Sequence, residues 1–354
     1  IVSSNLDELF EIRVAEFKEL LLAGRGRGDG NTLRASLAAI HERVRRLVAR
    51  QYELLNQTIL PQLAARGVVL HSWLNWTDAQ RQWAGRIFET EVEPLLTPIA
   101  LDPAHPFPRI LNKSLNFIVE QHGLDAFGRR AGIAIVQAPR ALPRILRVPP
   151  EVSGAPHGVM ALASIVQGFV DRLFPGLAVR SVHQFRLTRN SDLFVDDEEV
   201  TDLRAALQGE LVQRQYGDEV RLEVSAGISD ALVARLMREF ELEEQDCYRV
   251  DGPVNLVRLQ QIIDLVDQPA LKYPPFEPAV PAALRGKDLF AAIRKSEILV
   301  HHPYESFGPV MEFLVSAARD PRVVAIKQTV YRTGADSALM QALIDAALAG
   351  KEVT

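Results

Sequence analysis

Residues 323–337, Val-Val-Ala-Ile-Lys-Gln-Thr-Val-Tyr-Arg-Thr-Gly-Ala-Asp-Ser, decide the fold class of the C-terminal part of the chain. Residues 323–330 are rich in β-branched and apolar side chains, which predicts a buried strand. A polar turn follows, and Asp336 or Ser337 can cap a helix that ends at Gly350. Residues 351–354 begin a second strand, so the pattern predicts a β-α-β unit with parallel strands.

The first 98 residues carry a helical pattern. Apolar side chains recur at helical spacing over 6–22 and over 32–65, which predicts a helical hairpin. The residues of the second helix expected to face inward include Leu37, Ile40, Val44, Leu47, Leu54 and Leu55. Thr77 and Gln80 form a capping-box pattern that opens a further helix. We therefore expect an all-helical domain over residues 1–98.

The hydrophobic period changes near residue 115. Strands are expected over 115–120, 132–136, 181–188 and 220–224, and helices over 159–173, over 201–214 and after Ser229. This alternation predicts an α+β domain over residues 99–280. The proline-rich stretch 272–281 predicts a linker into a third domain, residues 281–354, with a helix over 288–295 and a strand over 298–300.

Composition narrows the class of protein. Hydrophobic residues make up 47% of the 354 and charged residues 24%, which is typical of a soluble globular protein. No apolar run approaches the roughly 20 residues of a membrane span, and no targeting peptide is visible, so we expect a cytoplasmic protein. A net charge of −5 argues against nonspecific nucleic-acid binding. Cys247 is the only cysteine, which excludes an intrachain disulfide and predicts a small buried or half-buried thiol.

Arg332 is the first candidate for chemistry. It follows a predicted parallel strand, and ligands collect outside the carboxyl ends of such strands. A guanidinium there can hold phosphate oxygens with two parallel hydrogen bonds. The alternative is a structural salt bridge, for example with Asp336. Lys327 could support the same anion, or it could be a lysine whose stem lies on apolar surface.

Other candidates have a structural interpretation that we favour. His301 and His302 are adjacent, and on a strand they would point to opposite faces rather than to one metal ion. The charged run Arg186, Arg189, Asn190 and Asp192 could contact an anion or could form a strand end and turn. The glycine-rich stretch 23–31 joins two helices and lacks a Gly-Lys-Ser/Thr ending, so we interpret it as a plain loop.

No nucleophile with a matching base is visible, but several long motifs occur together. They are Ser-Ser-Asn-Leu-Asp-Glu-Leu-Phe-Glu-Ile-Arg-Val-Ala at 3–15, Leu-Thr-Pro-Ile-Ala-Leu-Asp-Pro-Ala-His-Pro-Phe-Pro at 96–108, Phe-Arg-Leu-Thr-Arg-Asn-Ser-Asp-Leu at 185–193, His-His-Pro-Tyr-Glu-Ser-Phe at 301–307, and residues 320–337. In this order they resemble the first family of polyphosphate kinases.

The resemblance implies a multidomain α and β fold. It has a helical N-terminal domain, an α+β head domain used in dimer contacts, and the start of a phospholipase-D-like α/β domain. It also implies that Asn5 contacts the nucleotide and that Arg332 serves the phosphate and magnesium site, with Lys327 in support. The implied partners are ATP or ADP, inorganic polyphosphate and a second copy of the chain. Peripheral membrane association is the alternative to a purely cytoplasmic location.

The family's mechanism transfers the γ-phosphate of ATP to a histidine and then, reversibly, to the growing polyphosphate chain. The resemblance places that histidine, a second active-site histidine and a further arginine beyond Thr354, and the family's Arg-Glu-Leu-Ser-Trp-Leu stretch before Ile1. We therefore expect a cut chain without its catalytic residues. Two other classes stay open: a noncatalytic dimerisation scaffold and a phospholipase-D-type hydrolase, although no His-x-Lys-type motif occurs in the sequence.

Because the phosphate-accepting histidine is expected outside these residues, the isolated 354-residue chain should not synthesise polyphosphate. Incubation with ATP and Mg²⁺, followed by an assay for polyphosphate, measures this. Robust ATP-dependent synthesis by this chain would contradict the expectation.

Overall fold

The computed structural model describes residues 1–22, 30–101, 107–124, 132–191, 217–286, 288–330 and 337–354. The chain divides into two compact units, Ile1–Asp267 and Gln268–Thr354, and each is described by itself. The predicted helix over 201–214, the loop over 23–29, and Asp192 and Arg332 lie outside the described residues.

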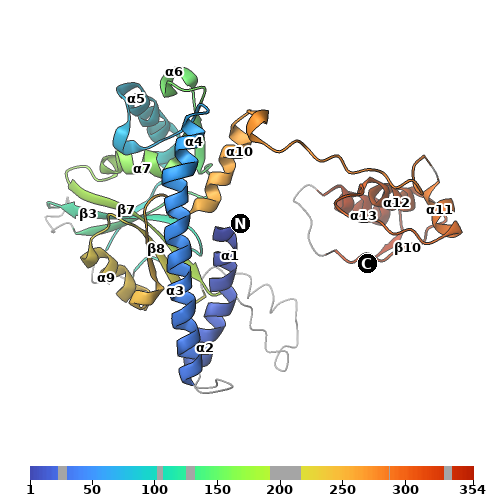
Figure 1. Cartoon of the computed structure of the whole chain (residues 1–354), viewed down its shortest axis with the longest axis horizontal. Coiled ribbons are helices and arrows are strands. Elements are labelled where there is room, and N and C mark those ends of the chain that lie inside the picture. Colours follow the sequence, from blue (N-terminus) through green and yellow to red (C-terminus); the bar gives the residue numbers. More distant parts are fainter. Residues whose placement is uncertain (23–29, 102–106, 125–131, 192–216, 287, 331–336) are drawn as a thin grey trace. The chain divides into compact units, whose positions relative to one another are not determined.

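Two long helical segments open the first unit and lie side by side (Figure 1). The first combines α1 (Val2–Glu8), a π-helical segment (Leu9–Val14) and α2 (Ala15–Leu22). The second combines α3 (Gly30–Leu54), a π-helical segment (Leu55–Ile59) and α4 (Leu60–Ala64). The helical hairpin is confirmed.

The inward face of α3 differs from the prediction at two positions. Leu47 and Leu54 are each 38% exposed, whereas Val48 and Tyr52 are buried. The buried positions are Leu37, His41, Val44, Val48, Tyr52 and Leu55. They advance by three or four residues and so follow one stripe of a 3.6-residue helix, from which Leu47 and Leu54 are displaced.

A strand interrupts the expected all-helical segment. After Gly67 (φ +80°), β1 (Val68–His71) pairs in parallel with β6 (His157–Ala161), which pairs antiparallel with β5 (Ile145–Val148). The prediction of helix over 159–173 is therefore wrong for its first three residues. Strand partners on both sides satisfy their backbone groups, and the helix begins only at α7 (Leu162–Phe169), which a 3₁₀ turn extends to Leu173.

A predicted capping box opens the helix between these strands. The Thr77 hydroxyl accepts from the Gln80 backbone N–H, and the Gln80 side chain accepts from the Thr77 N–H. The helix α5 (Asp78–Ile87) follows, continues through a π-helical segment (Phe88–Val92) and ends in a 3₁₀ turn at Glu93–Leu95, which contains Pro94. The predicted helix start is confirmed.

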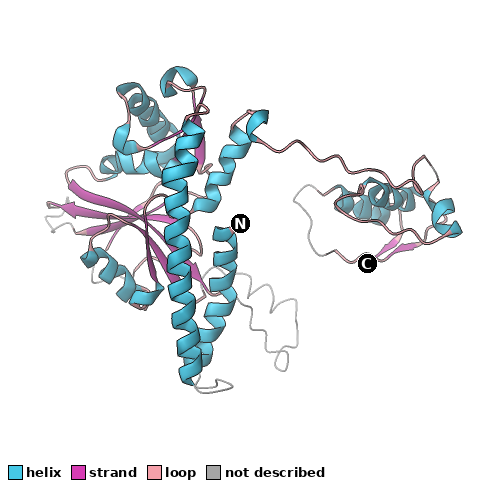
Figure 2. Cartoon of the chain, in the orientation of Figure 1, coloured by secondary structure: helices cyan, strands magenta, loops and turns pink. Residues whose placement is uncertain are grey.

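The larger sheet has six strands in the order β2-β4-β3-β7-β8-β9. Figure 2 draws the strands in magenta. They span Pro98–Ala100 (β2), Ile133–Gln137 (β4), Leu115–His122 (β3), Ala178–Arg189 (β7), Glu219–Ser225 (β8) and Cys247–Val250 (β9). All neighbours are antiparallel except β8 and β9. That parallel pair needs a crossover, which α9 (Asp230–Glu239) supplies with Ser229 as its N-cap.

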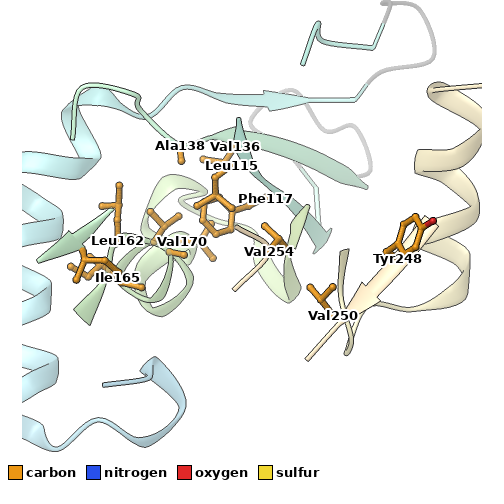
Figure 3. Close-up of a cluster of buried hydrophobic side chains, with 14 of the residues drawn as sticks. Leu115, Phe117, Val136, Ala138, Leu162, Ile165, Val170, Tyr248, Val250 and Val254 are labelled. Carbon is orange, nitrogen blue, oxygen red and sulfur yellow. The ribbon is translucent and has the colours of Figure 1, made fainter. Parts of the chain in front are cut away.

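Both faces of this sheet are covered. Phe117 and Val119 of β3 belong to a core shared with the N-terminal helices and α7, part of which Figure 3 shows. Ile118 of β3 and Phe185 of β7 belong to a second core with Leu236 of α9. Alternate residues of a strand point to opposite faces of the sheet, and here each face packs against a core. The residues on both faces are therefore apolar, and the strand sequences are nearly continuous hydrophobic runs.

Between β9 and the end of the first unit lie only short helical turns. These are a 3₁₀ turn at Leu256–Gln260 and α10 (Gln261–Leu265). Cys247 at the start of β9 is half-buried, as predicted, and burial raises the pKa of its thiol to about 11.

The second unit contains the predicted β-α-β element. The helices α11 (Leu289–Lys295) and α12 (Gly308–Arg319) come first in this unit. The β-α-β element follows and consists of β10 (Ala325–Ile326), α13 (Ala338–Leu348) and β11 (Glu352–Val353). The strands β10 and β11 are parallel, Ser337 caps α13, and Gly350 follows the helix with φ +85°. The β-α-β prediction is confirmed.

Two strand predictions in this unit are wrong. Of residues 323–330 only Ala325 and Ile326 form a strand, and Val324 is 77% exposed. Among the described residues only β11 pairs with β10, so the strand has neither the ladder nor the cover that its β-branched sequence favours. Residues 298–300 make no strand, and Leu299 is 92% exposed.

The observed mixture of helical regions and sheets confirms the predicted multidomain α and β class. Of the helices that the structure describes, none combines the length and the apolar character required of a membrane span.

His41 makes the first unit sensitive to acid. It is 1% exposed, its Nδ1 lies 2.8 Å from the Tyr248 hydroxyl, and its Nε2 lies 3.6 Å from Asp246 Oδ1. Burial lowers its pKa; Asp246 opposes the shift, and Lys18 adds to it. The folded chain therefore binds fewer protons than the unfolded chain. This part of the stability is present above the unfolded pKa of about 6.5 and is lost as pH falls below it.

We expect His41→Gln to reduce the loss of stability between neutral pH and about pH 5. Urea unfolding followed by tryptophan fluorescence measures it, because Trp73, Trp76 and Trp83 all lie in the first unit. His122→Gln, at the exposed end of β3, is the matched control. An unchanged pH dependence in His41→Gln would show that His41 is not responsible.

Candidate nucleotide and phosphate site

Asn5 lies on the solvent-exposed side of α1. Its backbone N–H donates to the carbonyl of Ile1 (2.9 Å), and its side chain makes no hydrogen bond to any residue that the structure describes. The nearby Ser3 hydroxyl accepts from Gln51 Nε2 of α3 (2.7 Å), which ties this turn to the second helix. The Asn5 amide can therefore bind a ligand without breaking an internal hydrogen bond.

Asp7, two residues later, lies in a buried cluster of four charges. Arg186 of β7 contacts Asp7 Oδ2 through Nη2 and Glu223 Oε2 through Nη1, both at 2.5 Å. Arg221 of β8 contacts Glu223 at 2.8 Å and lies 4.0 Å from Asp7. Burial alone would lower the pKa of Arg186, but Glu223 and Asp7 raise it overall, so its charge is retained. Two cations face two carboxylates, and the cluster is neutral.

Helix geometry connects this cluster to Asn5. Residues two apart on an α-helix differ by about 200° in direction, so fixing Asp7 inward turns Asn5 outward. The Arg221 guanidinium also lies 4.9 Å from the centre of the Phe10 ring and 4.8 Å from that of Tyr248. The cluster thus fixes both the rotation and the depth of α1 against β7 and β8.

Further polar contacts fasten the rest of this helical segment. Glu11 is buried and accepts from Lys113 Nζ and Asn112 Nδ2, both at 2.7 Å. Lys18 pairs with Asp246 (2.7 Å). The sequence motif indicated Asn5 but did not indicate Asp7 or Glu11. The feature of the sequence that could have identified Asp7 and Glu11 is their i, i+4 spacing, which places two acids beside the buried Leu6 and Phe10.

The charged run at the end of β7 has internal partners. Arg186 belongs to the cluster above, and Arg189 pairs with Glu219 (2.9 Å) and donates to the carbonyls of Ile110 and Gly217. The Asn190 amide donates to Glu19. These side chains form a structural strand end, which is the interpretation that the sequence favoured over anion binding.

The remaining predicted residues belong to the second unit. Lys327 directly follows β10 and is exposed, with no side-chain partner among the described residues. The exposed His301 and His302 sit in a local turn: the His301 N–H donates to Glu305 Oε2 (2.8 Å), and His302 Nδ1 lies 2.9 Å from the Glu305 carbonyl. Asn5 and Lys327 thus lie in different units, and within the described ranges no three His, Cys, Asp or Glu side chains gather to hold a metal.

Comparison with known proteins covers almost the whole chain. Residues 1–71 match the polyphosphate kinase N-terminal domain, 79–262 the polyphosphate kinase middle domain, and 288–354 the polyphosphate kinase C-terminal domain 1. The predicted boundaries at 98 and 280, which give domains 1–98, 99–280 and 281–354, stay predictions.

Individual relatives agree with these matches. The polyphosphate kinases of Burkholderia multivorans and Paraburkholderia phytofirmans are 57% and 55% identical over 357 aligned residues, which cover 100% of this chain and 52% of each relative. The chain thus spans about half the length of these curated relatives. The crystal structure of polyphosphate kinase from Porphyromonas gingivalis is 25% identical and aligns with 99% of this chain and 50% of its own, with a TM-score of 0.75. The chain belongs to the polyphosphate kinase family.

Proposed function

We propose that this chain supplies the nucleotide-contacting half of an enzyme that reversibly transfers the γ-phosphate of ATP to inorganic polyphosphate. Its family membership supports the reaction, and the observation that carries the nucleotide contact is the exposed Asn5, whose side chain has no partner among the described residues. The covalent step through a histidine is assigned to no residue of this sequence.

Asn5 suits recognition of the adenine base. A side-chain amide offers both a donor and an acceptor, and Asn binds the N6 and N7 atoms of adenine with two hydrogen bonds. Because α1 is fastened by Asp7 and Glu11, little additional ordering is needed when the base binds. We infer that Asn5 orients the nucleotide rather than taking part in phosphate transfer.

The phosphates require cations, and we infer that Arg332 and Lys327 supply them. Both follow the β10 segment, where the β-α-β topology favours an anion site. A guanidinium and an ammonium stabilise the charge that develops on the transferring phosphate.

Mg²⁺ is part of the proposal, as an ion carried by the nucleotide phosphates. Arg332 is itself a cation and cannot ligate the metal, and the described residues offer no cluster of carboxylates or imidazoles for it. No step is therefore derived through the metal. Bound Mg²⁺ would neutralise charge on the phosphate oxygens.

We also propose self-association through residues 99–280 and a cytoplasmic location, with peripheral membrane association as the alternative. Sedimentation velocity of the chain, with and without lipid vesicles, tests both. A monomer at all concentrations would contradict the self-association.

Asn5→Ala should weaken ATP binding about 5- to 150-fold, because a paired contact to adenine contributes about 1–3 kcal/mol. Calorimetric titration of the chain with ATP and Mg²⁺ measures the dissociation constant. Ser4→Ala, at the neighbouring exposed position, is the control and should bind ATP as the unmodified chain does. Unchanged affinity in Asn5→Ala would remove Asn5 from the site.

Asp7→Asn should destabilise the first unit by about 3–5 kcal/mol, because Arg186 and Arg221 would remain buried with one carboxylate between them. Urea unfolding followed by tryptophan fluorescence measures it. Glu8→Gln, one residue away and exposed, should change the free energy of unfolding by less than about 0.5 kcal/mol. Equal effects of the two substitutions would show that the cluster does not hold the helix.

A further inference from the structure

A small cavity in the first unit is lined by positive charge. It has a volume of ≈ 40 Å³ and lies against β3, β5 and the 3₁₀ turn that follows residue 255. Its polar lining includes Lys113, Arg144, Gln184 and Arg258. One water occupies roughly 10–15 Å³ on this kind of measure, so the cavity can hold an occupant larger than one water.

Arg144 has no partner for its charge in the part of the chain that the structure describes. Its Nη1 is buried, and its guanidinium makes no hydrogen bond or ion pair with any residue that the structure describes. Burial lowers the pKa of Arg144, and the like charges of Arg258 and Arg140 lower it further. Lys113 is already paired with Glu11. The cavity therefore holds uncompensated positive charge.

Arg144 is half-buried, and its buried Nη1 is costly to leave without a partner. Buried cations elsewhere in the same unit are paired: Arg186 and Arg221 face Asp7 and Glu223, and Arg189 faces Glu219. Arg144 is also held firmly, because its backbone N–H and that of Ile145 both donate to Gln261 Oε1 (3.0 and 3.1 Å). The backbone at Arg144 is thus fixed, and no residue that the structure describes neutralises its guanidinium.

The chemistry of the lining selects the anion. A guanidinium binds two oxygens of a phosphate group with parallel, charge-assisted hydrogen bonds. Gln184, which is 8% exposed, has an Oε1 that no described residue hydrogen-bonds, so the occupant should also carry a donor. A monoprotonated phosphate group offers both acceptor oxygens and one hydroxyl donor.

We propose that this cavity binds a single phosphate group, as orthophosphate or as the end of an oligophosphate, with Arg144 as its principal contact. The site contains none of the residues assigned to the nucleotide. It does not depend on the proposed kinase reaction.

Arg144→Gln tests the site, and Arg147→Gln, exposed on the strand β5 that begins directly after Arg144, is the matched control. Thermal unfolding of the 354-residue chain is followed by tryptophan fluorescence with and without orthophosphate, at constant ionic strength in chloride. Phosphate should raise the unfolding temperature of the unmodified chain and of Arg147→Gln, but not of Arg144→Gln. Calorimetric titration should show binding weakened about tenfold or more in Arg144→Gln.

A second readout separates a binding role from a structural one. In phosphate-free buffer Arg144→Gln should be at least as stable as the unmodified chain, because it removes a desolvated charge next to like charges. A large loss of stability in that buffer would overturn the proposal. So would an equal phosphate effect in Arg144→Gln, or no greater effect of phosphate than of chloride.

Titration with tripolyphosphate identifies the source of the phosphate group. Binding that is tighter than that of orthophosphate and depends on Arg144 indicates a chain end. Equal or weaker binding with the same dependence indicates free phosphate. Tripolyphosphate and orthophosphate binding that are both independent of Arg144 would overturn the site.

Discussion

The neutral cluster of Asp7, Arg186, Glu223 and Arg221 is the interaction on which the first unit depends. One carboxylate comes from the N-terminal helix, and the other three groups come from β7 and β8. A buried arginine without its carboxylate would carry a desolvation penalty of several kcal/mol, so the helix and the sheet require each other. The exposure of Asn5 follows from the same constraint, because the helix cannot rotate without unpairing Asp7.

Alternation along the strands explains why charges can lie under a helix in a hydrophobic protein. Phe185 and Leu187 of β7 point into the core with α9, and Leu222 of β8 joins them. The intervening Arg186 and Arg221 therefore point to the opposite face, toward the N-terminal helix. Arg144 is an exception to this pairing, since no carboxylate of the described residues meets it.

The second unit is held by a smaller core. Ala317, Ala318, Ile326, Leu343 and Ala346 are its buried apolar side chains. Lys351 adds two hydrogen bonds, from Nζ to the carbonyls of Asp320 and Val323 (both 2.6 Å), which join the segment before β10 to that before β11. The short parallel strands β10 and β11 are thus supported by the hydrogen bonds of the Lys351 side chain as well as by apolar burial.

The sequence by itself determined the features that depend on local chemistry. The helices, the caps at Thr77, Ser229 and Ser337 and the stop at Gly350 all follow from propensity and spacing. Tertiary structure decided the strand character of residues 68–71 and 159–161, the short β10 and the carboxylates that pair with Arg186. It also decided that no carboxylate of the described residues pairs with Arg144. Strand pairing and charge compensation join residues far apart in the chain, such as Asp7 and Arg186, and no local pattern specifies which partners meet.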